Sequence, residues 1–428
     1  MRVAIIGAGP AGLAAAIELS RLPFVDYTVY EKANQVKEIG AGISIQPSTW
    51  RLLEHLGAAQ HLRNSDWFAP EDHHYVRHYN GRTGRLLSTH FQENIPENLL
   101  HARCQRAVLQ KALLASNDRS RIRTSKKLVD ILQLPSGRVQ LRFEDGFLDE
   151  VDLVIGADGV RSMVRNHAFP EHKISYTGRT VYRTLLPTDL ARRVSGLPVD
   201  AVIFWHAPKG QWVYTCNLGG GVYELTVMTN EPLTDTEQQC VSWGEDAEVG
   251  SMSSHFKNFH RPLQDLFAMT GSIQRYAAFA GPRLPTVISN GNVALIGDAS
   301  HPLSGAFGAG AGFALEDAYT LARGLSWAHS ISSSALLVDA LKLFDRVRSP
   351  HYERLYGVLD AFKAVGETLA DPNVTLNDDE EVAVLVATNW AKRHGWIYEY
   401  DITVEVERLG TNVGVSWEKI VEPARARL

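Results

Sequence analysis

Residues 2–31 read RVAIIGAGPAGLAAAIELSRLPFVDYTVYE, and this stretch decides the fold. Residues 2–6 are a short apolar run that predicts a buried parallel strand. A glycine-rich turn follows at 7–12, then Ala and Leu with helical spacing over 13–22, and a second strand at 27–30. A strand, a helix and a strand within about thirty residues predict a right-handed β-α-β unit.

The glycine-rich turn of this unit has the pattern of a dinucleotide-binding motif. Gly7 permits the tight turn, Gly9 lets a pyrophosphate approach the backbone, and Gly12 lets helix and strand pack closely. The helix amides and the positive end of the helix dipole stabilise phosphate charge. Glu31, nineteen residues after Gly12, can accept hydrogen bonds from both hydroxyls of an adenosine ribose. We therefore predict dinucleotide binding; a purely structural glycine turn is the alternative.

Two later stretches repeat the pattern of a buried strand that ends in a glycine-and-acid turn. The first reads DLVIGADGVRS over 152–162, and the second reads GDASHP over 297–302, followed by GAGAG at 308–312. In this order the three motifs resemble the GxGxxG, DG and GD fingerprints of the group A FAD-dependent aromatic hydroxylases, which share the para-hydroxybenzoate hydroxylase fold. The salicylate hydroxylase-like branch is nearest, and the resemblance covers about residues 1–355.

The resemblance implies a set of flavin contacts. Asp298 would bind a ribityl hydroxyl, Arg106 would reach the pyrophosphate with Arg103 as a competitor, and the GAGI segment 40–43 would lie beside the isoalloxazine. Asp158 would contact FAD and the nicotinamide cofactor, with helix capping as its alternative role. The full predicted set is Gly7, Gly9, Ala11, Gly12, Glu31, Lys32, Gly42, Ile43, Arg106, Asp158, Asp298, Pro302, Gly308, Gly310, Ala311 and Gly312. The chain departs from the family at Ser48 and Gly312, where Asn is frequent.

The family's chemistry follows from the same resemblance. NADPH or NADH would reduce the FAD, and O2 would then form a hydroperoxide at flavin C4a that hydroxylates a small phenol or aromatic acid, with loss of CO2 if the substrate is a salicylate. Only one GxGxxG follows a strand, which fits a nicotinamide cofactor that visits the flavin without a domain of its own. The pocket should exclude water.

The predicted architecture is an α/β fold with three parts. A Rossmann-like FAD-binding domain would comprise residues 1–173 and 280–355, with a β-meander over 127–150. Residues 174–279 alternate apolar and polar side chains, which predicts an inserted antiparallel sheet that holds the substrate. Residues 356–428 are expected to be mainly helical.

Three side chains of the inserted sheet are the candidate catalytic residues. Arg183 could pair with a substrate carboxylate or phenolate, or form an ion pair at the domain edge. His206 could accept a phenolic proton, and Tyr214 could contact the substrate; both could equally be structural. Trp205 and Trp212 are candidate aromatic walls of the pocket, although core packing is expected for at least one.

Composition excludes several other classes. The 428 residues carry a net charge of −5, with 45% hydrophobic and 21% charged residues, as in a globular enzyme with no nucleic-acid or membrane partner. The three cysteines form no CxxC pair and the sixteen histidines no ligand spacing, so we expect neither a disulfide framework nor a metal site. No signal peptide is expected, which predicts a cytoplasmic location. A monomer or a homodimer is expected.

Competing functions stay open at this point. The same flavin chemistry could epoxidise an isoprenoid or meroterpenoid, although such relatives often carry membrane-spanning tails. A flavin halogenase is disfavoured because no WxWxIP segment is present. A non-catalytic FAD-shaped carrier is disfavoured by the intact motifs. The segment 396–401 (WIYEYD) resembles a tail of fungal salicylate hydroxylase-like proteins and suggests a fungal metabolic enzyme; an ordinary aromatic tail is the alternative.

Overall fold

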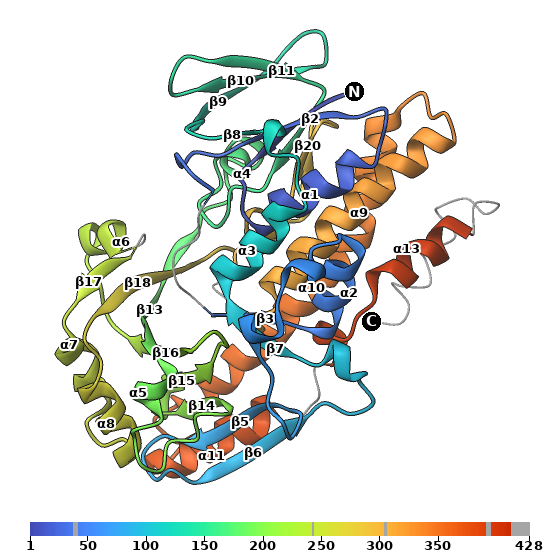
Figure 1. Cartoon of the computed structure of the whole chain (residues 1–428). Coiled ribbons are helices and arrows are strands. Elements are labelled where there is room, and N and C mark those ends of the chain that lie inside the picture. Colours follow the sequence, from blue (N-terminus) through green and yellow to red (C-terminus); the bar gives the residue numbers. More distant parts are fainter. Residues whose placement is uncertain (37–41, 242–243, 304–305, 391–394, 412–428) are drawn as a thin grey trace.

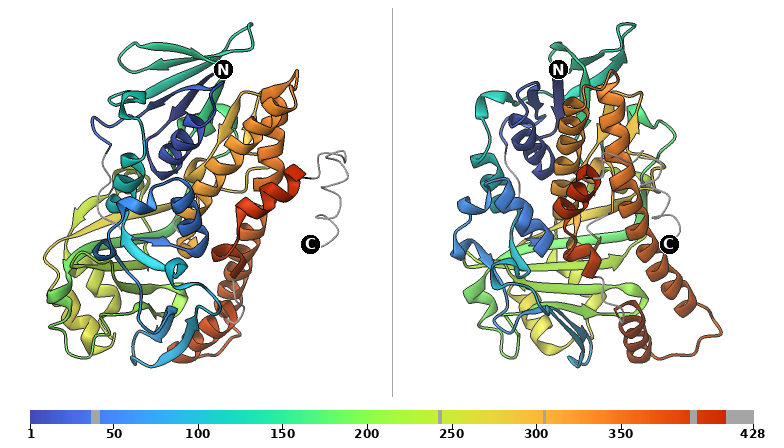
Figure 2. Two further views of the ribbon diagram at one scale, coloured as in Figure 1. Left: turned by 45° about the vertical axis from the view of Figure 1, so that its right-hand side comes forward. Right: turned by 90° about the vertical axis from the view of Figure 1, so that its right-hand side faces the viewer.

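The computed structural model describes residues 1–36, 42–241, 244–303, 306–390 and 395–411. Two β-sheets lie at opposite ends of the molecule, and two long helices, α9 (Gly310–Ser330) and α10 (Leu336–Leu369), run along one side between them (Figures 1 and 2). The three fingerprint motifs belong to the first sheet, and the candidate substrate residues belong to the second.

The first sheet has six strands in the order β19-β20-β12-β1-β2-β8. Strand β1 pairs in parallel with β12 and β2, β20 and β8 continue the parallel arrangement, and only the edge strand β19 is antiparallel. Helix α1 (Pro10–Ser20) makes the crossover from β1 to β2, as predicted. The strands are β1 (Arg2–Ile6), β2 (Asp26–Tyr30), β8 (Ile122–Arg123), β12 (Leu153–Gly156), β19 (Ile288–Ser289) and β20 (Val293–Leu295). The Rossmann-like α/β class is confirmed.

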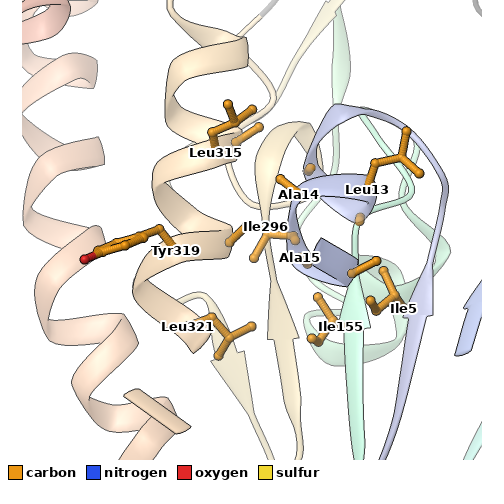
Figure 3. Close-up of a cluster of buried hydrophobic side chains, with 14 of the residues drawn as sticks. Ile5, Leu13, Ala14, Ala15, Ile155, Ile296, Leu315, Tyr319 and Leu321 are labelled. Atoms are coloured by element: carbon orange, nitrogen blue, oxygen red, sulfur yellow. The ribbon is translucent and has the colours of Figure 1, made fainter. Parts of the chain in front are cut away.

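Apolar side chains from all three fingerprint segments meet in one core (Figure 3). Ala14 and Ala15 of α1 lie near Leu315 of α9, while Ile5 and Ile155 come from the two central strands. All five side chains are essentially inaccessible to solvent. Small residues on α1 allow close packing of the helix, which holds the N-termini of α1 and α9 in a defined relation.

The predicted β-meander forms a separate antiparallel sheet of β9 (Leu128–Gln133), β10 (Val139–Phe143) and β11 (Leu148–Val151). Its two turns place Gly137 and Gly146 at φ +82°, a conformation that glycine adopts without strain. The chain passes directly from β11 into β12 of the parallel sheet.

The second sheet has eight strands in the order β17-β18-β13-β16-β15-β14-β5-β6. All pairs are antiparallel except β14 with β5, in which Ile203 lies opposite Arg77. The strands are β5 (His74–Asn80), β6 (Leu86–Phe91), β13 (Ser175–Pro187), β14 (Val202–His206), β15 (Trp212–Asn217), β16 (Val222–Asn230), β17 (Glu245–Ala247) and β18 (Ile273–Ala280).

This sheet corrects the expectation that it is confined to residues 174–279. Strands β5 and β6 come from the segment assigned to the FAD-binding domain, residues 1–173. Their pairing covers the edge of β14, which would otherwise present unpaired backbone groups. The local pattern of 74–91 is compatible with any sheet, so the sequence could not indicate which edge it joins.

The two faces of the second sheet have different environments. One face packs under α5 (Thr188–Ala191), α7 (Val249–Ser253) and α8 (Arg261–Ala268) in an apolar core. Trp205 belongs to this core, where its Nε1 donates to Thr215 Oγ1 at 2.9 Å, so it is not a wall of a pocket on the opposite face. The opposite face, which we call the aromatic face, carries Phe204, His206 and Tyr214.

The remaining elements connect the two sheets. A small sheet of β3 (Gly42–Ile45), β7 (Ala102–Gln105) and β4 (Trp67–Phe68) lies between them, with α2 (Pro47–His55) and α3 (Arg106–Ala115). The described part of the C-terminal segment is mainly helical, as predicted, with α11 (Asp378–Asn389), α12 (Gly395–Tyr398) and α13 (Ile402–Thr411). None of the helices in the described ranges combines the length and apolar character that a membrane crossing requires.

Candidate active site

The first turn shows why glycine is needed at two of its positions. Gly7 has φ +107°, and its N–H donates to Tyr30 O at 2.8 Å. A Cβ at residue 7 would lie 2.4 Å from Ala157 O, and one at Gly12 would lie 1.9 Å from Gly7 O. Both distances are impossible for carbon and oxygen in van der Waals contact, so these glycines set the strand-to-helix geometry.

Gly9 has a different role in the same turn. It precedes α1, and no described heavy atom lies within 4 Å of the position its Cβ would take. The N-terminal amides of α1 therefore face a space suited to a pyrophosphate. Glu31 lies beside it, with its carboxylate accepting from the backbone N–H groups of Ala8 and Ala33, both at 2.8 Å. This cradle fits a dinucleotide.

Asp158 of the DG motif caps a helix. Its carboxylate accepts from Met163 N at 2.7 Å, from Val164 N at 3.2 Å and from the Ser162 hydroxyl, at the start of α4 (Met163–Ala168). Burial raises the pKa of Asp158 although these hydrogen bonds oppose the shift. The capping role considered as an alternative is thus present; a cofactor contact stays a prediction.

The buried Arg165 ties the DG turn to the GD turn. Its guanidinium donates to Ala299 O at 3.1 Å and also to Val160 O. The sequence indicates no role for this arginine, since nothing local shows that its side chain spans two motifs. Arg165 keeps the two turns at a defined separation.

The carboxylate of Asp298 in the GD motif accepts no hydrogen bond from any other described residue. Its Oδ1 faces the N-terminus of α9, 3.7 Å from where a Cβ of Gly310 would lie. A half-buried carboxylate needs donors, and the hydroxyls of a ribityl chain would provide them. Asp317 stabilises the turn: its carboxylate accepts hydrogen bonds from Gly297 N and from Arg348 Nε, both at 2.8 Å.

The two departures from the family lie together. A Cβ at Gly312 would lie 2.9 Å from Thr49 Oγ1 and 3.4 Å from Ser48 Oγ, so the small residues complement each other. The side-chain oxygens of Ser48 and Thr49 that lie here are buried and lack hydrogen-bond partners among the described residues. Unpaired polar groups opposite the N-terminus of α9 fit the polar edge of an isoalloxazine.

The other predicted flavin contacts lie around these turns. Ala11 and Ala311 are buried near the starts of α1 and α9, Pro302 is buried after the GD turn, and Gly308 adopts φ +62°. Ile43 lies on β3, Arg106 begins α3 and Lys32 follows β2. Gly40 and Ala41 lie outside the described residues.

A buried ion pair joins the flavin side to the aromatic face. Arg103 Nη2 donates to Glu224 Oε2 at 2.5 Å, and Gly42 N donates to Glu224 Oε1 at 3.1 Å. Burial would raise the pKa of Glu224, but Arg103 and Arg183 hold it below its usual value. The Arg103 guanidinium is thus occupied by Glu224 and Ser44, and the pyrophosphate contact of Arg106 stays a prediction. Glu224 was missed because its partners are distant in sequence.

Arg183 and Tyr214 lie next to this ion pair. Arg183 Nε donates to Thr226 Oγ1 at 3.3 Å and is 3.8 Å from Glu224 Oε1, and about a third of its side chain is exposed. Tyr214 lies under the Arg103 guanidinium, 5.2 Å from ring centroid to Cζ. Two arginines face one carboxylate, so the cluster carries one net positive charge.

His206 lies further along the aromatic face and pairs with His78, a histidine that no sequence motif singles out. Its Nε2 is 2.8 Å from His78 Nδ1, and the two rings stack at 5.1 Å. Burial lowers the pKa of His206 to about 3, so the imidazole is neutral in ordinary buffers. His78 belongs to β5, the strand that joins this sheet from the N-terminal segment.

Comparison with known proteins identifies the family. Residues 1–342 match the family model described as "FAD binding domain", so the chain belongs to this family. It is a group A FAD-dependent aromatic monooxygenase, with FAD as cofactor and NAD(P)H as co-substrate. The resemblance drawn from the three motifs is confirmed.

Individual relatives agree with this assignment. A 3-amino-4-hydroxybenzoate 2-monooxygenase of Streptomyces platensis is 31% identical, over 82% of this chain and 86% of its own length. The salicylate hydroxylase of Pseudomonas putida is 27% identical, over 98% of this chain and 96% of its own length. The solved structure of a salicylate hydroxylase substrate complex has a TM-score of 0.77, covers 96% of this chain and 98% of its own, and at 24% identity shows the shared fold.

Proposed function

We propose that this enzyme hydroxylates a small phenol or aromatic acid held on the aromatic face, with decarboxylation if the substrate is a salicylate. The observation that carries the proposal is that Arg183, His206 and Tyr214 share one face of one sheet. Arg103 and Glu224 connect that face to Gly42, beside the predicted isoalloxazine position. The hydroxybenzoate and salicylate relatives support this substrate class.

Bound FAD would accept hydride from NAD(P)H and activate O2 for transfer to the ring. The net positive charge of Arg103, Arg183 and Glu224 would attract a substrate carboxylate or phenolate. His206 is neutral, and its Nε2 pairs with His78 Nδ1. In the tautomer that donates from Nε2 to His78, Nδ1 of His206 would accept a hydrogen bond from a phenolic hydroxyl of the substrate. Phe204, which packs against His206 and Tyr214, would help to exclude water from these two side chains.

The test is turnover of the FAD-loaded protein with a panel of phenols and aromatic acids. NADH and NADPH oxidation would be followed by absorbance and products by mass spectrometry. Products with one added oxygen on the ring support the proposal, and loss of CO2 identifies the decarboxylative route. Failure to oxidise NAD(P)H with any aromatic compound, or an epoxide as the product, would contradict it.

Arg183→Gln separates substrate binding from folding. KM for aromatic acids should rise about tenfold, because one charge-assisted contact is lost, with a smaller change for uncharged phenols. Arg192→Gln is the control, since that arginine pairs with Asp200 on the surface at 2.7 Å. An equal effect of the two substitutions would remove Arg183 from the substrate site.

Cytoplasmic location, a monomeric or dimeric state and a fungal origin stay predictions.

A further inference from the structure

The C-terminal segment contributes a side chain to the aromatic face. Helix α11 lies against β5 and β6 at the end of the large sheet (Figure 1). Its Asp379 accepts from Asn80 Nδ2 at 3.1 Å and from Arg82 Nε at 2.9 Å. The side chain of Asn377 caps the helix. These polar contacts fix the position of the residue that follows the helix, Trp390.

Trp390 packs between the sheet and the loop that precedes α9. Its ring centroid lies 4.6 Å from that of His78 and 6.4 Å from that of Phe204, both on the aromatic face. It also lies 6.0 Å from Phe307, in the loop between the GD turn and α9, and 5.6 Å from Phe362 of α10. The indole therefore bounds the aromatic face on the side of α11 and α10.

A cavity of about 60 Å³ adjoins Trp390. Its lining includes Gln46, Tyr75, His90 and Tyr398 as well as the indole. A benzene ring fills an apolar cavity of roughly 150 Å³, so this space alone is too small for an aromatic ring. Because Trp390 contacts His78 and Phe204 and also lines the cavity, its removal would extend the cavity to the aromatic face.

We propose that Trp390 is a specificity-determining residue: it separates the aromatic face from this cavity and thereby limits the substrate to a single ring. The proposal rests on the proposed function, because it assumes that the aromatic face holds the substrate. The family model ends at residue 342, so this wall comes from a part of the chain outside the matched domain. A change in the C-terminal segment could alter substrate size without altering the flavin site.

The direct test compares binding of phenol and 2-naphthol to the FAD-loaded protein without NAD(P)H, by isothermal titration calorimetry. In Trp390→Ala the naphthol-to-phenol affinity ratio should rise at least about tenfold over the unsubstituted protein, because the second ring enters the joined space. Trp390→Phe keeps an aromatic wall and should give a smaller rise. If circular dichroism shows that Trp390→Ala does not fold, the affinity ratio of Trp390→Phe serves as the test.

Trp396→Ala is the matched control on the same segment. Trp396 lies over Arg354 at 4.1 Å and beside His351 at 5.2 Å, away from the aromatic face, so its loss should leave the affinity ratio unchanged. An unchanged ratio in both Trp390 variants, or an equal rise in Trp396→Ala, would overturn the proposal. If phenols are hydroxylated but the ratio does not move, only this inference fails. If no phenol or aromatic acid of the panel is oxidised either, the proposed function fails with it.

Discussion

The turn at residues 7–12 and the aromatic face of the large sheet differ in where their functional groups come from. The turn presents backbone amides and the space beside Gly9, all within one β-α-β unit. The aromatic face presents side chains from β5, β14, β15 and the residue after α11, which are separated by up to about three hundred residues in the chain. One region is local backbone geometry, and the other is an assembly of distant side chains.

The difference separates two physical requirements. Phosphate binding needs amides and a dipole, which any helix offers once a glycine turn orients it. A substrate pocket needs particular side chains at particular separations, so its selectivity depends on packing between elements. Substitutions in the turn should therefore change cofactor affinity, whereas substitutions on the face should change substrate choice or stability.

The largest effect is expected at Gly9. Gly9→Ala should lower the affinity for FAD roughly 100-fold, about 2.7 kcal/mol, because the added methyl group occupies the space predicted for the pyrophosphate. Its φ of −73° suits alanine and no described atom lies within 4 Å, so the thermal midpoint of the apoprotein should not change. Fluorescence titration of the apoprotein with FAD measures the affinity.

Gly250→Ala is the control for that experiment, because its Cβ also meets no described atom within 4 Å and it lies on α7, away from the turn. Equal FAD affinity in the Gly9 and Gly250 variants would show that the turn does not hold the pyrophosphate.

On the aromatic face, His206 should make the protein sensitive to acid. Burial lowers its folded-state pKa to about 3, whereas an unfolded histidine has a pKa near 6.5. Between these values the unfolded chain binds one more proton, so the unfolding free energy falls as pH decreases through this window. At pH 5 the loss is about 2 kcal/mol relative to pH 7.

Denaturant titrations at pH 7 and pH 5 would measure this loss. His206→Gln should reduce the pH dependence, while His61→Gln, at an exposed position, should not. If the two variants had the same pH dependence, His206 would not be the buried neutral group inferred here.

Asp298 and Asp158 provide the next contrast, between two acids of the flavin side. Asp298→Asn should lower FAD affinity about tenfold, because a neutral amide oxygen replaces the carboxylate that would accept from the ribityl hydroxyls. The apoprotein should remain as stable as before, since no described group hydrogen-bonds this carboxylate. Unchanged FAD affinity would exclude the ribityl contact.

Asp158→Ala should show the smallest effect. In contrast to Asp298→Asn, it should change the stability of the protein and not its affinity for FAD. Ser162 remains as the N-cap of α4, and loss of the Asp158 hydrogen bonds to Met163 N and Val164 N should lower the apparent unfolding free energy by about 1 kcal/mol. FAD affinity should stay within about twofold if capping is its whole role, and a tenfold loss would show that Asp158 also contacts the cofactor. Denaturation of the apoprotein and FAD titration distinguish the two outcomes.

The sequence was sufficient for the parallel sheet, the three turns and the flavin class, but insufficient for most of the substrate site. Arg183, His206 and Tyr214 were placed on one sheet because strand alternation is visible locally. Their partners Glu224 and His78 were not found, because the ion pair forms only when β7 meets β16, and the histidine pair only when β5 meets β14. The same limit applies to β5 and β6, whose pairing partner no local pattern specifies.

Glycine positions, strand and helix periodicity and acids at strand ends are properties of short segments, so the amino-acid sequence by itself determined the cofactor-binding framework of this protein. Tertiary structure alone decided which arginine is neutralised by Glu224, which face of the sheet is aromatic, and that Trp390 reaches it from the C-terminal segment. Such contacts depend on distances between elements remote in the chain, and those distances are set by packing.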